Sequence, residues 1–254
     1  MIAIPAPDAP IREVTIERIL PGGVGMGHAA GQTVLVPMTA PGDVVRVRID
    51  REQGRTAFGT LLDVITPSPE RDGPPYPTLE ESGGCDFRHL RYEAQLAAKR
   101  EIVRDTLRRI AGIPNPPDIE IVPSPDPWAY RSRAEWHIDH ERGVIGSVAP
   151  NSHEVTDADQ CQTLTPALTA TLADLREKLR TEQIPDNVTA IQAVEGDEAV
   201  SIFPAPGKRR AREISVTVNG IAYRFDASVF FQSNLSLLPA LVEEAMWQAQ
   251  PIPR

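Results

Sequence analysis

The chain is short of cysteine, of aromatic residues and of long apolar runs. Its 254 residues include only two cysteines, which excludes a disulfide-built scaffold and favours a reducing compartment. No run approaches the roughly 20 apolar residues that a membrane-spanning helix needs. The first residues lack the basic segment and apolar core of a signal peptide. A cytoplasmic protein without a membrane anchor is the resulting prediction.

Positive charge is also scarce. Lys and Arg number 26 against 35 Asp and Glu, a net charge of −9, whereas nonspecific nucleic-acid binders are usually basic. A specific binder is not excluded, because a local basic strip can be sufficient. One strip is Lys208, Arg209, Arg210 and Arg212; a second, on an expected helix over residues 93–111, is Lys99, Arg100, Arg104, Arg108 and Arg109. A solvated surface is the alternative for both strips.

Residues 11–66 have the pattern of a small β-barrel. Apolar Val45, Val47 and Ile49 alternate with polar residues, and glycine- and proline-rich turns separate several short strands. Such a pattern in fewer than 60 residues favours a closed barrel of the OB kind. The glycine-dense stretch 21–27 precedes a strand and not a helix, so we interpret it as a sharp bend in preference to a phosphate cradle.

This stretch carries the first resemblance to a known family. The order GGVGMGHAAGQTVLVPMTAPGDVVRVRI at residues 22–49, followed by Ser68-Pro69-Glu70-Arg71, resembles the TRAM domain. TRAM domains open many uracil-5 RNA methyltransferases and occur in related RNA-modifying enzymes. The resemblance therefore implies contact with RNA.

A more specific resemblance lies at residues 82–99, SGGCDFRHLRYEAQLAAK, where the methyltransferases have CGGCxxQHLxYxxQLxxK. In many members this region binds a four-iron cluster through thiolates, which are soft anionic ligands. Here the cluster positions are Tyr76, Ser82, Cys85 and Cys161, so only two thiolates remain and we expect no iron–sulfur cluster. Two small buried cysteines are the simpler interpretation. A zinc site completed by His89 or His153 is a third possibility.

The next resemblance lies at residues 130–138, YRSRAEWHI, which are similar to the family's YRNR strand. Arg131 and Arg133 alternate with small residues, which places both guanidinium groups on one face, a suitable arrangement for phosphate. Ion pairs with Glu135, Asp139 or other carboxylates are the alternative. Around this strand we expect an α+β domain, with helices over 93–111 and 164–182 and further strands over 143–149, 153–161, 190–194 and 199–203. The first helix is expected to be amphipathic, with an apolar stripe of Leu96, Ile102, Val103, Leu107 and Ile110.

Residues 225–234, FDASVFFQSN, resemble the family's Fxx(S/A)xxFFQxN element. The resemblance implies that Gln232, with Phe231 beside it, lines the S-adenosylmethionine site. Before it, Asn219-Gly220 predicts a hairpin over 214–225. After it, Asn234 is placed to cap a helix over 235–249 whose apolar stripe is Leu237, Leu238, Leu241, Val242 and Met246. Without the resemblance, a helix cap and two core phenylalanines would explain these residues.

Together these motifs imply an α+β multidomain chain. The expected domains are a TRAM barrel at 8–67, a central α+β domain at 68–213 and the beginning of a Rossmann-like methyltransferase domain at 214–254. The family that the chain resembles is the S-adenosylmethionine-dependent uracil-5 RNA methyltransferases, which implies rRNA or tRNA as the substrate. A monomer is expected.

The chemistry sets a further expectation. A thiolate must add to C6 of uracil before C5 can accept a methyl group, and a base must then remove the C5 proton. In the family both residues follow the helix that ends here, so we expect a C-terminally truncated chain without activity of its own. A non-catalytic RNA-binding module is the alternative. A radical methylthiotransferase would need a C-x3-C-x2-C motif, which the sequence lacks.

Overall fold

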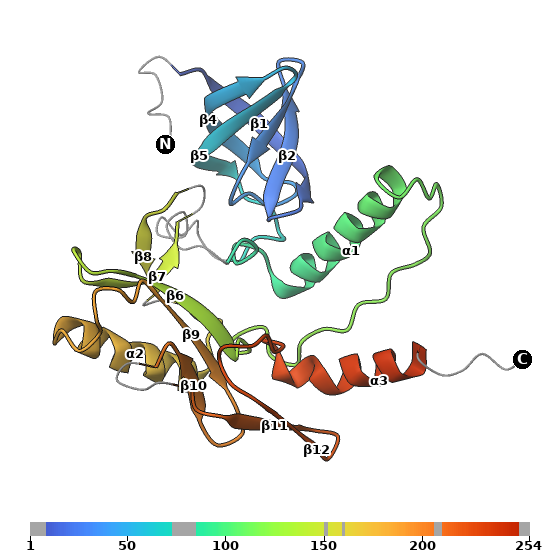
Figure 1. Cartoon of the computed structure of the whole chain (residues 1–254). Coiled ribbons are helices and arrows are strands. Elements are labelled where there is room, and N and C mark those ends of the chain that lie inside the picture. Colours follow the sequence, from blue (N-terminus) through green and yellow to red (C-terminus); the bar gives the residue numbers. More distant parts are fainter. Residues whose placement is uncertain (1–8, 73–84, 150–151, 159–160, 206–209, 249–254) are drawn as a thin grey trace, which may run out of the picture. The chain divides into compact units, whose positions relative to one another are not determined.

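The computed structural model describes residues 9–72, 85–149, 152–158, 161–205 and 210–248 (Figure 1). The chain divides into two compact units, Met1–Ile121 with Pro150–Ser152 and Val122–Ala149 with His153–Arg254. The boundary near residue 121 differs from both predicted domain boundaries, and the division into three domains stays a prediction. Among the described residues, no helix is long and apolar enough to cross a membrane.

The first unit contains the predicted closed barrel. Its strands are β1 (Ile11–Leu20), β2 (Val24–Ala29), β3 (Gln32–Val36), β4 (Val44–Gln53) and β5 (Thr56–Thr66). They close in the order β1-β2-β3-β5-β4, with β3 and β5 parallel and the other pairs antiparallel. Alternate side chains fill the interior, among them Val34, Val36, Val45 and Val47, each fully buried. The expected OB-like barrel is thereby confirmed.

The interpretation of residues 21–27 as a sharp bend is correct for Gly22 and Gly23 and wrong for Gly25 and Gly27. Gly22 and Gly23 form the turn, at φ +80° and +72°, but Gly25 and Gly27 lie inside β2. A Cβ atom on Gly27 would stand 2.2 Å from the carbonyl oxygen of Thr15, on the neighbouring strand. Glycine is required at this position because two backbones approach closely, which the local sequence does not reveal.

Below the barrel, the chain forms α1 (Tyr92–Arg109), as expected, with Gly112 at φ +67° just beyond its end. Ala94, Ala98 and Ile102 of this helix pack with Ile19 and Leu90. The predicted apolar stripe is partly wrong: Val103 is 44% exposed and Ile110 is 83% exposed. Two alanines and Ile102 thus face the barrel, and the small alanines allow close packing of the helix.

The second unit is built on a five-stranded sheet in the order β10-β9-β6-β7-β8. The strands are β6 (Arg133–Asp139), β7 (Val144–Val148), β8 (Val155–Asp157), β9 (Ala190–Glu195) and β10 (Val200–Phe203). Helix α2 (Pro166–Arg180) begins at Thr165, whose hydroxyl accepts a hydrogen bond from the N–H of Leu168 at 3.3 Å. Its leucines pack on the sheet around Trp136 and Ile191. All these elements agree with the predicted α+β domain.

The last described elements are a hairpin and a helix. Strands β11 (Ile214–Val218) and β12 (Ile221–Phe225) pair around Asn219-Gly220, both at positive φ, as expected. A 3-10 turn (Leu235–Leu237) then leads into α3 (Leu238–Gln248). Leu238 and Val242 pack on the hairpin, whereas Leu241 and Met246 of the predicted stripe are exposed.

The predicted cap at Asn234 is wrong in its chemistry. Asn234 occupies the N-cap position of the 3-10 turn, but its side chain makes no capping hydrogen bond. Its amide donates to the Ser124 hydroxyl at 3.1 Å and its carbonyl oxygen accepts from the Ser236 hydroxyl at 3.0 Å. Asn234 therefore joins two distant segments of the second unit and does not satisfy the helix backbone.

Candidate functional site

Two of the residues predicted to bind RNA, Arg131 and Arg133, lie in the second unit beside the segment 226–234, which contains the predicted cofactor residues Phe231 and Gln232. The main-chain N–H of Ser132 donates to the Ser233 carbonyl at 2.8 Å, and the Ser132 hydroxyl donates to the same oxygen at 3.0 Å. An antiparallel bridge joins Arg131 to Asn234. Residues about 100 positions apart in the chain are thus held side by side.

The backbone of Arg131 pairs with two other segments of the chain, residues 163–165 and Asn234. Its N–H donates to the Thr163 carbonyl at 2.8 Å, and its own carbonyl accepts from the Thr165 N–H at 3.1 Å. A parallel bridge to Leu164 accompanies the antiparallel bridge to Asn234. Arg131 is half-buried in this three-segment junction, and its predicted contact with RNA stays a prediction.

The guanidinium group of Arg133 is directed toward the same segment. It donates to the carbonyl oxygens of Val229 at 2.7 Å and Ala227 at 3.4 Å, and to the side-chain oxygen of Gln192 at 2.7 Å. These acceptors are neutral, so the bonds are not the ion pairs with Glu135 or Asp139 that the sequence offered as an alternative. Arg133 thereby fixes two carbonyls of a segment that has no strand or helix of its own.

The two phenylalanines of the segment have opposite environments. Phe231 stacks on Phe225, with ring centroids 3.9 Å apart and an interplanar angle of 12°, and it packs in the small core beneath β11 and β12. Phe230 is 76% exposed, and Gln232 is exposed as well. Gln232 can therefore meet a ligand directly, whereas one face of the Phe231 ring is already covered by Phe225. Their predicted cofactor contacts stay predictions.

Asp226 opens the segment as a tight turn. Its carboxylate accepts from the hydroxyl of Ser228 at 2.5 Å and from the N–H of Ser228 at 2.8 Å. The hydroxyl bond, followed by the N–H bond, holds the pKa of Asp226 below its usual value. The Asp226 carboxylate is therefore charged at neutral pH and can accept both hydrogen bonds of the turn.

The basic strip is only partly described. Lys208 and Arg209 lie outside the described residues, and Arg210 is exposed. Next to them, the carbonyl of Arg212 accepts a hydrogen bond from the buried Ser201 hydroxyl at 2.6 Å, and that hydroxyl accepts from the N–H of Ala227 at 3.0 Å. The end of the strip is thus tied to the beginning of the segment 226–234.

The cluster positions show no assembled metal site in the part that is described. Cys85 and Cys161 are both half-buried, while Tyr76 and Ser82 lie outside the described residues. The Cys161 sulfur lies 3.2 Å from the Thr163 hydroxyl. Within the described ranges, no three His, Cys, Asp or Glu side chains are grouped to hold a metal. Two thiols do not match the donor set of a four-iron cluster.

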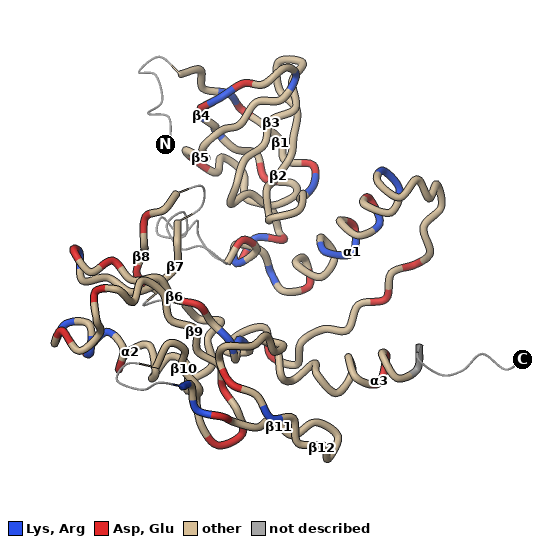
Figure 2. The backbone as a smooth tube through the Cα atoms, in the orientation of Figure 1, with Lys and Arg blue, Asp and Glu red and all other residues tan. Residues whose placement is uncertain are grey.

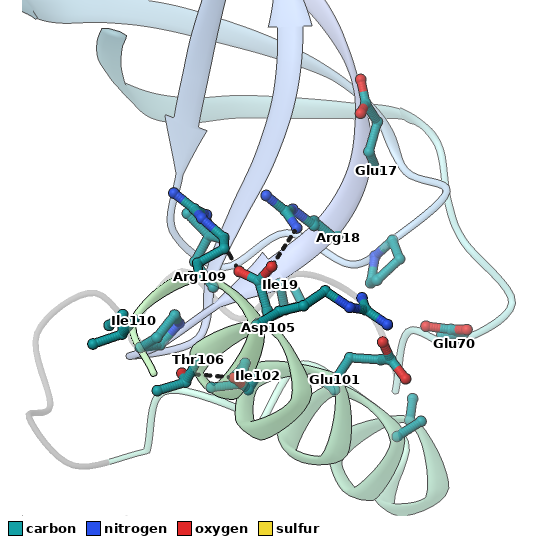
Figure 3. Close-up of a pocket in the computed structure, with 17 residues that line it drawn as sticks. Glu17, Arg18, Ile19, Glu70, Glu101, Ile102, Asp105, Thr106, Arg109 and Ile110 are labelled. Atoms are coloured by element: carbon teal, nitrogen blue, oxygen red, sulfur yellow. Dashed lines mark hydrogen bonds and ion pairs between the residues drawn. The ribbon is translucent and has the colours of Figure 1, made fainter. Parts of the chain in front are cut away.

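The first unit has a groove of about 580 Å³ between β1 and α1 (Figure 3). Ile19, Ala94, Ala98 and Ile102 contribute its apolar part. Asp105 accepts from Arg109 at 3.2 Å and lies 3.6 Å from Arg18. The lining has three arginines, Arg18, Arg108 and Arg109, against four carboxylates, Glu17, Glu70, Glu101 and Asp105. This balance does not favour phosphate.

Charges of both signs are interspersed along α1 as a whole (Figure 2). Arg104 lies 3.3 Å from Glu101, and Arg109 lies 3.2 Å from Asp105, at the spacings of three and four residues that suit a solvated helix surface. Two of the five basic residues of the second strip, Arg104 and Arg109, are thus paired with carboxylates of the same helix. Of the two strips, the one at 208–212 is the better candidate for RNA.

Sequence reasoning missed a buried polar cluster in the first unit. Asp43, fully buried, accepts from Arg71 at 2.5 and 3.3 Å and from the N–H groups of Ala40 and Ser68. His89 lies beside this pair, with its Nε2 2.9 Å from the Thr39 carbonyl. Arg71 and His89 both stand in motifs quoted for the resemblance, and that was the only signal for them.

Burial is the main cause that lowers the pKa of His89 to about 4, and the Arg71 charge acts in the same direction. The Thr39 hydrogen bond and the Asp43 charge oppose this shift. Its Nδ1 atom is buried and has no hydrogen-bond partner in the described part of the chain. His89 is therefore neutral at physiological pH and belongs to the packing of this unit.

In comparisons with known proteins, the chain is similar to proteins named as RNA methyltransferases. A family model for the TRAM domain of tRNA (uracil(54)-C(5))-methyltransferase matches residues 12–69. An uncharacterized RNA methyltransferase of Nostoc sp. is 34% identical over 176 residues, 68% of this chain and 38% of the relative. A second, from Aquifex aeolicus, is 29% identical over 196 residues, 77% of this chain and 45% of the relative. The chain thus spans less than half the length of these curated relatives.

Among solved structures, the Pyrococcus abyssi tRNA (uracil-54, C5)-methyltransferase, in complex with S-adenosyl-L-homocysteine, has a similar fold. The TM-score is 0.70 at 22% identity, over 94% of this chain and 65% of that chain. At this identity the likeness concerns the fold alone. Residues 12–69 are a TRAM domain of the type found in tRNA (uracil(54)-C(5))-methyltransferases, and the chain is a relative of RNA methyltransferases.

Proposed function

We propose that this chain takes part in the methylation of uridine C5 in tRNA or rRNA, with S-adenosylmethionine as the methyl donor. The observation that carries the proposal is the joining of the two resemblance motifs: Ser132 and Arg133 hold the segment 226–234 through the carbonyls of Ser233, Val229 and Ala227. The relatives named as RNA methyltransferases and the TRAM barrel support RNA as the partner. We also propose that the protein acts in the cytoplasm as a monomer.

The described residues partly fit the methyl donor. Gln232 is exposed on a hydrogen-bonded segment and would contact it, with Phe231 shaping the wall behind. S-adenosylmethionine, when bound, supplies an electrophilic methyl group. The protein's task on this side is to orient the donor and the base. Holding the two reactants close together and aligned lowers the activation barrier of such a transfer.

We assign the RNA contact first to Lys208, Arg209 and Arg210, with Arg131 as a further candidate. Phosphate contacts made by a compact basic strip give affinity that falls steeply with salt. The triple change of Lys208, Arg209 and Arg210 to Ala tests this assignment by fluorescence anisotropy on a tRNA transcript. We expect about a tenfold loss of affinity and a shallower salt dependence.

A matched control removes equal charge from α2: Arg176, Lys178 and Arg180 to Ala. These three residues already pair with Asp157, Asp174 and Glu177. We expect this control to stay within about twofold of the unchanged chain in RNA affinity, because its charges are locally compensated. Equal losses in the two triple variants would show that the strip has no special role.

We further propose that the 254 residues by themselves do not transfer a methyl group. Both cysteines, Cys85 and Cys161, precede the segment 226–234, whereas the resemblance places the nucleophilic thiol after it. The test combines the purified chain, a uridine-containing tRNA or rRNA fragment and isotopically labelled S-adenosylmethionine. Binding of RNA without label transfer is expected. Robust transfer would refute the proposed inactivity, and absence of RNA binding would refute the proposed partner.

A further inference from the structure

The sequence predicts Arg133 as a phosphate contact, but the geometry points to another task. We propose that Arg133 is a positioning residue that sets the conformation of the segment 226–234, with Gln192 as its orienting partner. What the segment then binds rests on the proposed function. The hold of Arg133 on the segment does not.

The first step is the direction of the guanidinium group. Two of its three described hydrogen bonds go to main-chain carbonyls two residues apart, those of Ala227 at 3.4 Å and Val229 at 2.7 Å. A guanidinium is a planar fork with five donors, which suits two acceptors on one side. Lysine has no such fork and holds one direction less firmly.

The second step is the relay that orients the fork. The side-chain oxygen of Gln192 accepts from Arg133 at 2.7 Å, and its amide nitrogen donates to the Glu135 carboxylate at 3.1 Å. Glu135 and Gln192 are directly opposite each other on β6 and β9. The carboxylate fixes which end of the Gln192 amide faces Arg133, so the sheet itself determines the direction of the guanidinium group.

The third step is the consequence for the segment. Residues 226–234 contain no helix or strand in the structure, yet their carbonyls are held at Ala227, Val229 and Ser233. With the backbone fixed at these points, Phe231 turns inward onto Phe225 while Phe230 and Gln232 remain exposed. Arg133 therefore orders an irregular segment so that chosen side chains are displayed.

Hydrogen–deuterium exchange of the intact 254-residue chain tests this assignment, read out on the peptide that covers residues 226–234. For Arg133→Met we expect exchange in this peptide to accelerate at least tenfold, while β9 stays protected and reports an intact sheet. Arg133→Lys should recover only part of the protection. Gln192→Leu, which leaves the arginine without its orienting partner, should give an intermediate acceleration. Arg180→Met on α2 is the control and should leave the segment unchanged.

RNA affinity of the same variants separates positioning from phosphate contact. The positioning role predicts that Arg133→Met keeps the affinity for a tRNA transcript and its salt dependence within about twofold. A loss of affinity that Arg133→Lys restores, with unchanged exchange of the segment, would overturn it, as would unchanged exchange in both Arg133→Met and Gln192→Leu. If the unchanged chain binds no RNA, the proposed function fails in its partner, whereas the exchange result still decides the role of Arg133.

Discussion

Arg71 reaches back across the barrel rim to bind Asp43, with nitrogen–oxygen distances of 2.5 and 3.3 Å, and both side chains are almost completely buried. The pair ties the segment after β5 to the turn before β4. It also explains why the Ser68–Arg71 motif follows the barrel: Ser68 donates its N–H to the same carboxylate. The motif is thus a structural lock of the first unit.

Breaking this lock should be costly. Arg71→Met leaves the Asp43 carboxylate buried without its cation, and we expect the free energy of unfolding to fall by about 3–5 kcal/mol. Arg46→Met is the control, because Arg46 and Asp63 lie 3.9 Å apart and are both about half exposed. The control should cost about 0–1 kcal/mol. Urea unfolding of both variants measures the difference, and equal costs would contradict the lock.

The lowered pKa of His89 predicts a stability that depends on pH. The folded chain keeps His89 neutral down to a pKa of about 4, whereas the unfolded chain protonates it near 6.5. Between these values only the unfolded state gains the proton, so stability falls as the pH drops, by roughly 3 kcal/mol in total. Above pH 6.5 this residue contributes no pH dependence.

His89→Gln removes the titration of the histidine from the pH dependence of stability. The glutamine amide can still donate a hydrogen bond to the Thr39 carbonyl, so the packing contact is kept. Urea midpoints at pH 7 and pH 4.5 should differ less for this variant than for the unchanged chain. An identical pH dependence in both proteins would mean that His89 is not the responsible group.

Gly27→Ala tests the close approach of β2 to β1. The added methyl group would stand 2.2 Å from the Thr15 carbonyl oxygen, so one strand must shift, and we expect a loss of about 1–3 kcal/mol. Gly54→Asn is the comparison: Gly54 has φ +59° and no atom within 4 Å of an added Cβ, and asparagine tolerates this conformation. Thermal unfolding should show a large shift for the first variant and a small one for the second.

Phe230 and Phe231 are adjacent, but we expect truncation to alanine to lower stability at Phe231 and to have almost no effect at Phe230. Phe231→Ala removes the ring stacked on Phe225, and because Phe231 is only half-buried we expect a loss of about 1–3 kcal/mol. Phe230→Ala should change stability by less than about 0.5 kcal/mol, since its ring is 76% exposed. Similar losses in the two variants would show that the stacking does not stabilise the hairpin.

Periodicity predicted most elements, but it could not predict which of their residues touch. The alternation of Val45, Val47 and Ile49 gave the barrel strand, and Asn219-Gly220 gave the hairpin. The prediction failed at Gly25 and Gly27, because a glycine needed for close backbone contact resembles a glycine needed for a turn. It also failed in part on α1, where Ala94, Ala98 and Ile102 face the barrel while Val103 and Ile110 are exposed.

The sequence by itself determined the order of elements, the TRAM barrel and the motifs that relate the chain to RNA methyltransferases, because these depend on short-range spacing. Only the tertiary structure decided the partners of Arg71, Arg133 and Asn234. Those partners lie 28, 96 and 110 residues away in the chain, and no local pattern encodes a contact over such separations. The physical reason is that a buried donor binds whichever acceptor the fold brings to it, and that choice exists only once the sheets have closed.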